Sequence, residues 1–356
     1  MPRLPYPPAR APSRSAPERL GSFWNQVGLV AFALILGSTP AEADPATSYY
    51  AAIDSTNSAS LRQSLHALVD DHQRYPYTST ATDTWDILEE AQSDPEAEGF
   101  ILDLYGDRSL VREGGGNSEY NREHTWPKSY GFPSDSSQNS AYTDCHMLFL
   151  ADSGYNSSRS NKPYGSCDAS CTEKPTGDAF DESPLPGVYP GQSNWTKAGV
   201  WETWGERRGD VARALLYADI RYEGGHHGDT GASEPDLILT DALALIQTTP
   251  GNTSVAYMGD LSTLLQWHNQ DPPDQGERAR NDIVESYQGN RNPFIDHPEW
   301  VDCVFSEVCD SAPIPLPTLN PAFLAVWILT MAFTGVAMAH RFSSETRAAS
   351  KKTPRH

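Results

Sequence analysis

Basic side chains are scarce in this sequence. Its 356 residues include 26 Lys and Arg against 47 Asp and Glu, which gives a formal net charge of −21. A broad basic surface for nonspecific nucleic-acid binding is therefore disfavoured. A polyanionic partner would need a local basic cleft or a bridging metal ion, while the acidity by itself fits solubility in a salty medium equally well.

Several common signatures are missing as well. The sequence has no internal repeat, no nucleotide-binding Gly-rich loop and no serine nucleophile elbow. These absences argue against a repeat protein, a typical nucleotide-binding fold and a serine hydrolase with such an elbow. Hydrophobic residues still make up 38% of the chain, which is enough for a real core.

Long apolar runs occur only at the two ends of the chain. Residues 1–43 contain four Arg, an apolar run from Val27 to Gly37 and the small-residue motif Ala41-Glu-Ala43. This arrangement is typical of a signal peptide. We therefore predict an exported protein with its folded domain at 44–310.

The C-terminal end carries a second targeting pattern. Residues 322–339 are uncharged and mostly apolar, long enough for a transmembrane helix. A Pro-rich linker at 311–321 precedes them, and the basic tail at 340–356 is placed in the cytoplasm by the positive-inside rule. These parts resemble the C-terminal sorting tags of bacterial surface proteins, which a membrane protease usually removes. We expect a protein at the cell surface or in the periplasm, anchored in the membrane by this helix or released after processing.

The region between these ends is more acidic than the whole chain. Residues 44–320 hold 17 basic and 44 acidic side chains, a net charge of −27. Cysteines are few, and all five lie in this region: Cys145, Cys167, Cys171, Cys303 and Cys309.

In an oxidising compartment, closely spaced cysteines favour disulfides. We predict the pairs Cys167–Cys171 and Cys303–Cys309, which leave Cys145 over. The competing interpretation is a zinc site of Cys145, His146, Cys167 and Cys171, although no pair has the Cys-x2-Cys spacing of common zinc modules.

Apolar periodicity predicts a largely helical domain. Residues 46–75 form a helical lead with Leu61, Leu65 and Leu68 on one face, a second short helix begins at Trp85, and 99–105 is a strand. Residues 278–287 form a further helix, whereas the Pro- and Gly-rich stretch 162–200 is predicted to be a long ordered loop.

Two further helices begin with an Asp as N-cap. Asp210 is expected to cap a helix running to Tyr222, and Asp260 caps another. His268 falls on the apolar stripe of the second of these helices. Its position favours a hydrogen-bonded core histidine over a metal ligand.

The segment 121–130, Asn-Arg-Glu-His-Thr-Trp-Pro-Lys-Ser-Tyr, is the strongest candidate for chemistry. Glycines at 114–116 precede it, and Gly131 and Pro133 close it, so a short strand or loop presents its charged side chains together. Trp126 and Pro127 are interpreted as a scaffold for the turn. An adjacent Glu-His pair is common on protein surfaces, so this segment alone does not establish a site.

Other motifs follow this segment in a fixed order. They are Asp144-x-His-x-Leu148, Ala151-Asp-Ser-Gly-Tyr-Asn-Ser-Ser-Arg-Ser-Asn161, Gly209-Asp-Val-Ala-Arg-Ala214, Trp267-His-Asn-Gln-Asp-Pro272 and Asn290-Arg-Asn-Pro-Phe-Ile-Asp-His-Pro298. With the segment 121–130 they resemble the bacterial endonuclease I family of secreted nonspecific nucleases, over roughly residues 50–300. The resemblance implies an α+β fold, a mainly helical mixed domain containing a ββα-metal (His-Me finger) nuclease core.

The resemblance also implies roles for single residues of an endonuclease I-like catalytic domain. His124 matches the general base, and Glu123 and Asn156 match the metal ligands. Arg159 matches an Arg on the same helix as Asn156 that meets the phosphate, and His146 matches a hydrogen-bonding position that supports the metal site. The candidate substrate contacts are Arg122, Lys128 and Asn161.

The sequence departs from the family pattern at a few positions. Met147 and Leu150 stand where the family commonly has Asn and Pro. An Arg that some members place between the His and the Asn is missing, because residues 130–155 contain no Arg or Lys. Its work would fall to Arg122, Lys128 or Arg159.

These residues suit phosphodiester hydrolysis, which needs an activated water and stabilisation of charge on the phosphate and the leaving oxygen. A neutral imidazole can accept the proton of the water. One carboxylate and one amide leave open water positions, which favours Mg2+, with Mn2+ or Ca2+ as alternatives. The metal would supply the positive charge that the acidic surface lacks.

We therefore predict an exported, metal-dependent endonuclease that cuts DNA, with RNA as a second substrate, without strong sequence preference and as a monomer. Two alternatives stay open: a catalytically inactive, surface-displayed binding domain, and a phosphodiesterase for a small nucleotide.

Overall fold

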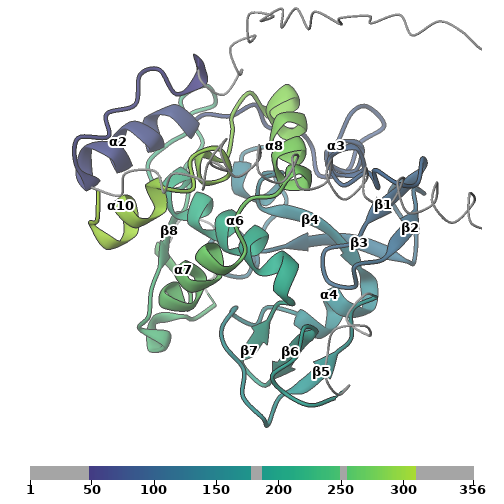
Figure 1. The fold of residues 1–356 in the computed structure, drawn as a ribbon. Coiled ribbons are helices and arrows are strands. Elements are labelled where there is room, and N and C mark those ends of the chain that lie inside the picture. The colour runs from purple at the N-terminus through teal and green to yellow at the C-terminus, as the bar shows by residue number, and fades with distance from the viewer. Residues whose placement is uncertain (1–47, 178–186, 249–254, 310–356) are drawn as a thin grey trace, which may run out of the picture. The chain divides into compact units, whose positions relative to one another are not determined.

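Helix α6 (Arg208–Arg221) lies at the centre of the fold in the computed structural model, which describes residues 48–177, 187–248 and 255–309 (Figure 1). Its Ala and Leu residues favour helix, and nearly all of its side chains are buried. The elements that pack around it are α2 (Ser58–Val69), α7 (Leu261–Gln270), α9 (Pro293–Asp296) and β8 (Asp236–Leu239).

Because α6 is covered on all sides, its charged side chains need partners inside the protein. Arg213 donates two hydrogen bonds to the carboxylate of Glu277, and Arg221 donates to both oxygens of Glu234. These buried pairs fix how α6 meets its neighbours, since breaking one would leave an uncompensated charge in the core.

The strands of the described residues form four small sheets. Three are antiparallel: β1 (Phe100–Leu102) with β2 (Ser109–Val111), β3 (Tyr120–His124) with β4 (Leu148–Asp152), and the three-stranded sheet of β5 (Thr172–Lys174), β6 (Asn194–Lys197) and β7 (Val200–Glu202). The fourth is the parallel pair of β8 with β9 (Val255–Met258).

The unit that positions the candidate site is β3, β4 and α4 (Ser153–Arg159). The two strands pair from Tyr120 opposite Asp152 to His124 opposite Leu148, and α4 starts directly after β4. Asp152 caps the helix, because its side chain accepts hydrogen bonds from the amides of Gly154 and Tyr155. This short connection holds α4 against the strand pair.

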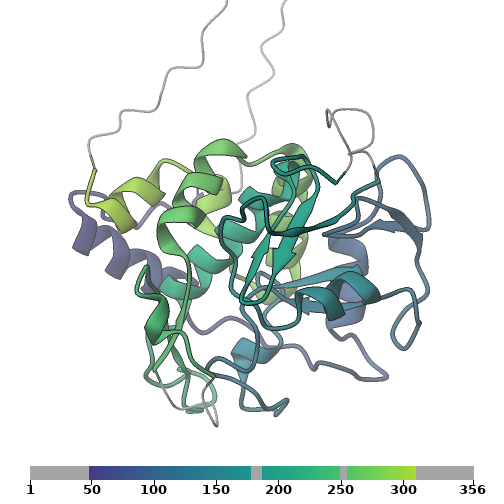
Figure 2. The same ribbon diagram turned by 90° about the horizontal axis from the view of Figure 1, so that it is seen from below.

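The remaining helices cover this unit and close the core. Helices α3 (Thr84–Ala91) and α8 (Gln275–Gln288) pack against each other, and α3 also contacts β4. Helix α10 (Trp300–Ser306) lies beside α2, so the two ends of the described chain meet on one side of the domain (Figure 2). The short 3-10 helices are η1 (Ser140–Tyr142), η2 (Gly205–Arg207) and η3 (Leu243–Leu245).

The predicted α+β class is confirmed, with three local differences. The stretch 162–200 contains β5 and β6 and the start of β7 rather than only loop. Helix α6 begins at Arg208, so Asp210 lies in its first turn and is not its N-cap. In α2, Leu61, Leu65 and Val69 are fully buried, while Leu68 is only partly buried.

Both predicted disulfides, Cys167–Cys171 and Cys303–Cys309, are formed, and Cys145 is buried as a free thiol. The alternative zinc site is therefore wrong, because two of its proposed ligands, Cys167 and Cys171, are bonded to each other. Within the described residues no group of three or more His, Cys, Asp or Glu could hold a metal ion.

Four predicted segments lie outside the described residues: the signal peptide at 1–43, the linker at 311–321, the membrane or sorting helix at 322–339 and the tail at 340–356. In the part that the structure describes, no helix is both long and apolar enough to cross a membrane.

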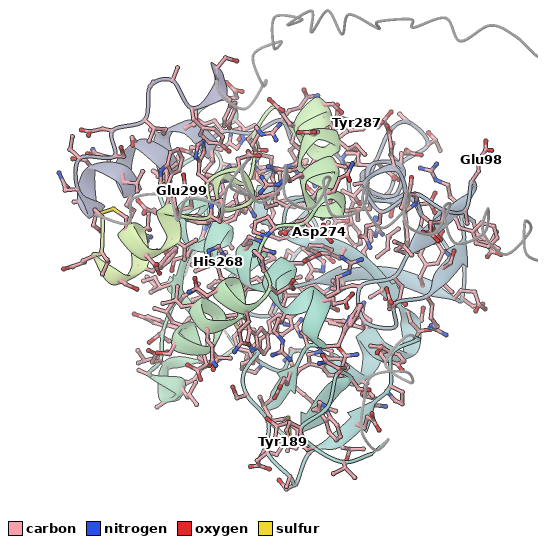
Figure 3. The ribbon with its side chains drawn as sticks, viewed as in Figure 1. Glu98, Tyr189, His268, Asp274, Tyr287 and Glu299 are labelled. Carbon is pink, nitrogen blue, oxygen red and sulfur yellow. A yellow bond between two sulfur atoms is a disulfide. The ribbon has the colours of Figure 1, made fainter. Side chains whose placement is uncertain are left out.

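His268 is a core histidine, as predicted from its place on the apolar stripe of α7 (Figure 3). One of its ring nitrogens, Nε2, lies 3.0 Å from the carbonyl oxygen of Pro298, and burial lowers the pKa of His268 to about 4. In the unfolded chain the pKa returns to the usual value near 6.5. The unfolded state therefore binds a proton between pH 6.5 and 4 that the folded state does not, so stability falls as the pH falls through this window.

We predict that the stability of His268→Gln falls less steeply with decreasing pH than that of the wild type, because glutamine keeps a donor for the carbonyl of Pro298 but does not titrate. The difference in unfolding free energy between wild type and variant should change by about 3 kcal/mol between pH 7 and pH 4. Urea denaturation at several pH values measures this difference. A constant difference across the range would show that His268 is not the titrating group.

Candidate active site

A cavity of about 400 Å³ opens where β3 ends beside α4. Glu123 and His124 at the end of β3 meet Asn156 of α4 there, although 32 residues separate His124 from Asn156 in the chain. The lining residues are Tyr77, Arg122, Glu123, His124, Pro127, Lys128, Ser129, Asn156, Ser157, Ser160 and Asn161. Six of the eight side chains predicted for the site therefore line one cavity.

Glu123 is held by one of its two carboxylate oxygens. Its Oε1 accepts a hydrogen bond from the hydroxyl of Tyr105 at 3.0 Å and pairs with Arg159 Nη1 at 2.7 Å. Burial raises the pKa of Glu123 to about 7, even though Arg159 and Tyr105 lower it. Oε2 has no donor among the described residues, which leaves it for a ligand in the cavity.

Arg159 is not among the residues that line the cavity. Its side chain is fully buried, and besides Glu123 it donates to the backbone carbonyls of His124 at 2.8 Å and Thr125 at 2.6 Å. The guanidinium also lies 4.4 Å from the ring centre of Tyr164. This position differs from the sequence-based expectation of a phosphate contact, because the donors that would meet a phosphate are turned to the protein.

The imidazole of His124 is fixed by a carbonyl and two aromatic rings. Its Nε2 lies 2.9 Å from the carbonyl oxygen of Tyr142 and therefore carries the proton. Tyr77 stacks on the imidazole at 5.8 Å between ring centres, and the Tyr142 ring meets it edge-on. Burial lowers the pKa of His124 to about 3, so the ring is neutral at physiological pH with its other nitrogen, Nδ1, free to accept a proton.

Asn156 lines the same cavity as Glu123. Its Nδ2 donates to the side chain of Asn121 and, at 3.2 Å, to the carbonyl of Arg122. The amide oxygen Oδ1 accepts no hydrogen bond within the described chain. A free carboxylate oxygen and a free amide oxygen are hard donors of the kind that Mg2+, Mn2+ and Ca2+ prefer.

The rim of the cavity is basic although the protein is acidic. Arg122 and Lys128 form no ion pair with a carboxylate in the described part of the chain, and Lys128 Nζ donates only to the hydroxyl of Tyr142, at 2.8 Å. Asn161 lies on the same rim, with its Nδ2 3.4 Å from Ser129 Oγ. The cavity therefore combines two cations that have no carboxylate partner with one carboxylate, Glu123, and one neutral amide, Asn156.

His146 does not lie at this cavity. Its Nε2 is 3.0 Å from the carbonyl oxygen of Asn290, its backbone amide donates to Asp144, and its ring lies 4.8 Å from that of Tyr217. These contacts lead into the core between β4 and α6, so the structure does not bring His146 together with Glu123 and Asn156, and its support of a metal site stays a prediction.

Sequence reasoning missed the tyrosines around the site. Tyr105 fixes Glu123, Tyr77 and Tyr142 hold His124, and the hydroxyl of Tyr164 lies 2.6 Å from that of Tyr105. They come from four separate segments and share no motif with segment 121–130. The abundance of tyrosine, 16 in all, was the only signal available, and it does not single out these four.

Two curated relatives share much of this chain. An extracellular ribonuclease of Bacillus amyloliquefaciens is 37% identical over 257 residues, covering 71% of this chain and 76% of the relative. An extracellular ribonuclease of Bacillus subtilis (strain 168) is 36% identical over the same length, covering 71% of this chain and 77% of the relative.

The cavity at the end of β3 lies within a segment that matches a known family. The model of the Endonuclease I family matches residues 57–299. The chain belongs to the Endonuclease I family. The resemblance seen in its sequence is thereby confirmed, and the matched range contains every residue that lines the cavity.

We predict that Arg159→Met lowers the free energy of unfolding by about 3–5 kcal/mol, because it leaves the Glu123 carboxylate buried without its partner. The double variant Glu123→Gln/Arg159→Met should recover part of this loss, since it removes the unpaired charge. Denaturant unfolding of wild type and both variants measures the effect. A loss below about 1 kcal/mol in the single variant would mean that Arg159 is free for another contact.

Proposed function

We propose that this protein is an exported, metal-dependent endonuclease that hydrolyses phosphodiester bonds in RNA. The observation that carries the proposal is that Glu123, His124 and Asn156 line one cavity with a basic rim, and that each keeps an acceptor, Oε2, Nδ1 and Oδ1 respectively, without a hydrogen bond to the described residues. The extracellular ribonucleases that the chain resembles favour RNA and export. The signal-peptide pattern at 1–43 supports export independently.

His124 acts as the general base in this proposal. The carbonyl of Tyr142 accepts a hydrogen bond from Nε2–H, so the free lone pair is on Nδ1, which takes the proton of the attacking water. The rings of Tyr77 and Tyr142 restrict the imidazole to this orientation. A neutral base is available over the whole physiological pH range because burial disfavours the imidazolium.

Glu123 and Asn156 would hold one divalent cation through their free oxygens. The fit rests on the donor set: one carboxylate and one amide oxygen are hard ligands and leave several positions for water and phosphate, as Mg2+ prefers. When bound, such an ion polarises the phosphate and stabilises the leaving oxygen. The sequence of β3, β4 and α4 that carries these ligands supports a ββα-metal core.

Arg122 and Lys128 provide the anion attraction that the rest of the surface lacks. Lys128 is exposed, so its ammonium group can move from the Tyr142 hydroxyl to a phosphate oxygen. Arg159 is a positioning residue in this account, since it holds Glu123 and the end of β3 without touching the substrate.

Digestion assays on the full chain separate the possible functions. Purified protein is incubated with total RNA and with plasmid DNA, each with Mg2+ and with EDTA. We predict fragmentation of RNA with Mg2+ and none with EDTA, while the DNA arm tests the sequence-based prediction that the protein cuts DNA. Binding without cleavage would favour an inactive binding domain, and hydrolysis restricted to small nucleotides would favour a phosphodiesterase.

The role of His124 is tested by His124→Ala, with His226→Ala as the control, because His226 is exposed and does not line the cavity. Loss of a general base should reduce the cleavage rate by about 10²–10⁴-fold. Initial rates on RNA at saturating Mg2+ measure the change. Cleavage by His124→Ala at the control rate would exclude His124 as the base.

The metal ligands are tested by Glu123→Gln and Asn156→Ala, with Asn269→Ala as an exposed control on α7. Each ligand variant should need a higher Mg2+ concentration for half-maximal activity, since Asn156→Ala removes the amide oxygen and Glu123→Gln removes the negative charge of the carboxylate. The measurement is activity against Mg2+ concentration. If both variants follow the wild-type curve, the metal is held elsewhere.

A further inference from the structure

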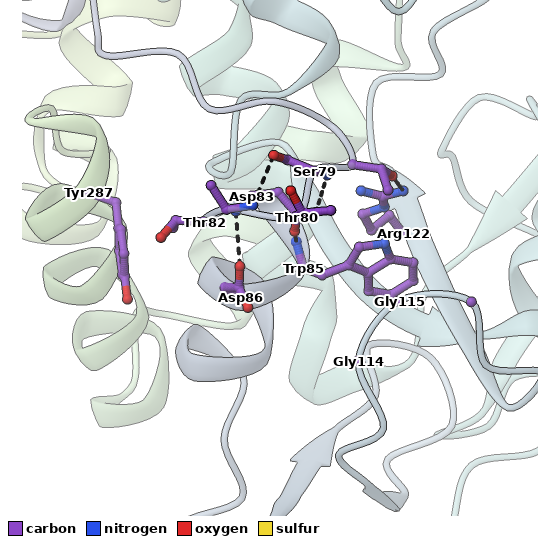
Figure 4. A pocket seen from close by; sticks show the side chains of 13 residues that line it. Ser79, Thr80, Thr82, Asp83, Trp85, Asp86, Gly114, Gly115, Arg122 and Tyr287 are labelled. Atoms are coloured by element: carbon purple, nitrogen blue, oxygen red, sulfur yellow. Dashed lines mark hydrogen bonds between the residues drawn. The ribbon is translucent and has the colours of Figure 1, made fainter.

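A second cavity, of about 930 Å³, adjoins the candidate active site (Figure 4). It lies between the loop before α3, the glycines at 114–116 and Tyr287 of α8. Arg122 lines both cavities and forms the wall that they share. If the phosphate of a nucleic-acid strand binds in the first cavity, only the side chain of Arg122 separates it from the second cavity.

The side chain of Arg122 is fixed by its neighbours. Its guanidinium lies between two aromatic rings, 3.3 Å from the ring centre of Tyr77 and 4.2 Å from that of Trp85. It donates hydrogen bonds to the carbonyl of Tyr77 and to the hydroxyls of Thr84 and Thr78. The cation is thus held at the boundary of the two cavities by contacts that involve no carboxylate.

The walls of the second cavity differ in chemistry from those of the first. Arg122 is the only cation among its lining residues, and two carboxylates, Asp83 and Asp86, also line it. A second phosphate would meet these carboxylates and be repelled. The remaining lining groups are mainly hydroxyls and backbone: Thr78, Ser79, Thr80, Thr82, Gly114, Gly115 and Gly116.

Trp85 contributes its indole edge to the second cavity. Its indole Nε1 finds no acceptor in the described part of the chain, and Gly115 passes so close that an added Cβ would lie 2.5 Å from this nitrogen. Only glycine allows the backbone to approach the indole edge in this way. Uncharged hydrogen-bonding groups beside an aromatic edge suit a nucleobase and its ribose.

We propose that the second cavity is a base-binding subsite for the nucleotide next to the cleaved phosphodiester, a proposal that rests on the nuclease function above. Its volume lies within the range of about 300–1,000 Å³ that is usual for small-molecule sites. A base that is paired and stacked in a duplex cannot enter without leaving its partner, whereas an unpaired base can. The subsite therefore favours single-stranded substrate.

The test uses Thr80→Met, which places a larger side chain in the second cavity without touching the first. Thr80 is exposed, and its side chain has no hydrogen bond to the described residues. The control is Thr56→Met, an exposed threonine before α2 that lines neither cavity. The kcat/KM is measured for a single-stranded RNA oligonucleotide and for a fully paired duplex of the same sequence, with melting temperatures to verify folding.

We expect Thr80→Met to lose about tenfold in kcat/KM on the single strand, the size of a lost base contact, and less than about twofold on the duplex. Wild-type protein that cleaves only the single strand would agree with the subsite too. An unchanged single-strand rate, or an equal loss on both substrates, would overturn the subsite while leaving the nuclease intact. A wild type that cleaves neither substrate would overturn the proposed function and this subsite with it.

Discussion

The buried ion pair between Arg159 and Glu123 is the constraint on which the site depends. Arg159 is fully buried, and it ties the last turn of α4 to the carboxylate of Glu123 and to two carbonyls at the end of β3. Because the pair engages only Oε1, the second oxygen of this cavity-lining side chain is left without a donor among the described residues. Asn156 lies three residues before Arg159 on α4, so one helix supplies both the anchor for Glu123 and the amide oxygen beside it.

The second requirement is a neutral base in an acidic protein. The backbone carbonyl of Tyr142 sets the tautomer of His124, and its side-chain hydroxyl accepts a hydrogen bond from Lys128. Tyr77 likewise contacts both His124 and Arg122. The unpaired cations of the rim are thus held by aromatic rings and hydroxyls instead of carboxylates. A strongly negative chain can therefore keep a local attraction for phosphate, although its net charge of −27 over residues 44–320 disfavours a broad basic surface.

Sequence patterns predicted helices that have one apolar and one polar face. They did not give the correct start of α6, which is buried on all sides. The stripe of α2 and the core position of His268 followed from periodicity, and the disulfides followed from close spacing in an exported chain. The resemblance to endonuclease I named Glu123, His124 and Asn156, which line one cavity. It also named Arg159 and His146, which do not line this cavity, because a motif records which residue is present and not whether its donors face substrate or core. The start of α6 was misplaced because a helix buried on all sides has no polar face to mark its boundaries.

The most direct measurement for the account is the position of a bound cation. Crystals grown with Mn2+ and recorded near the manganese absorption edge would locate the ion by its anomalous scattering. The account predicts one strong peak in the first cavity, about 2 Å from both Glu123 Oε2 and Asn156 Oδ1. A cation bound elsewhere, or one whose ligands include neither oxygen, would contradict the claim that the Arg159–Glu123 pair prepares this site for a metal.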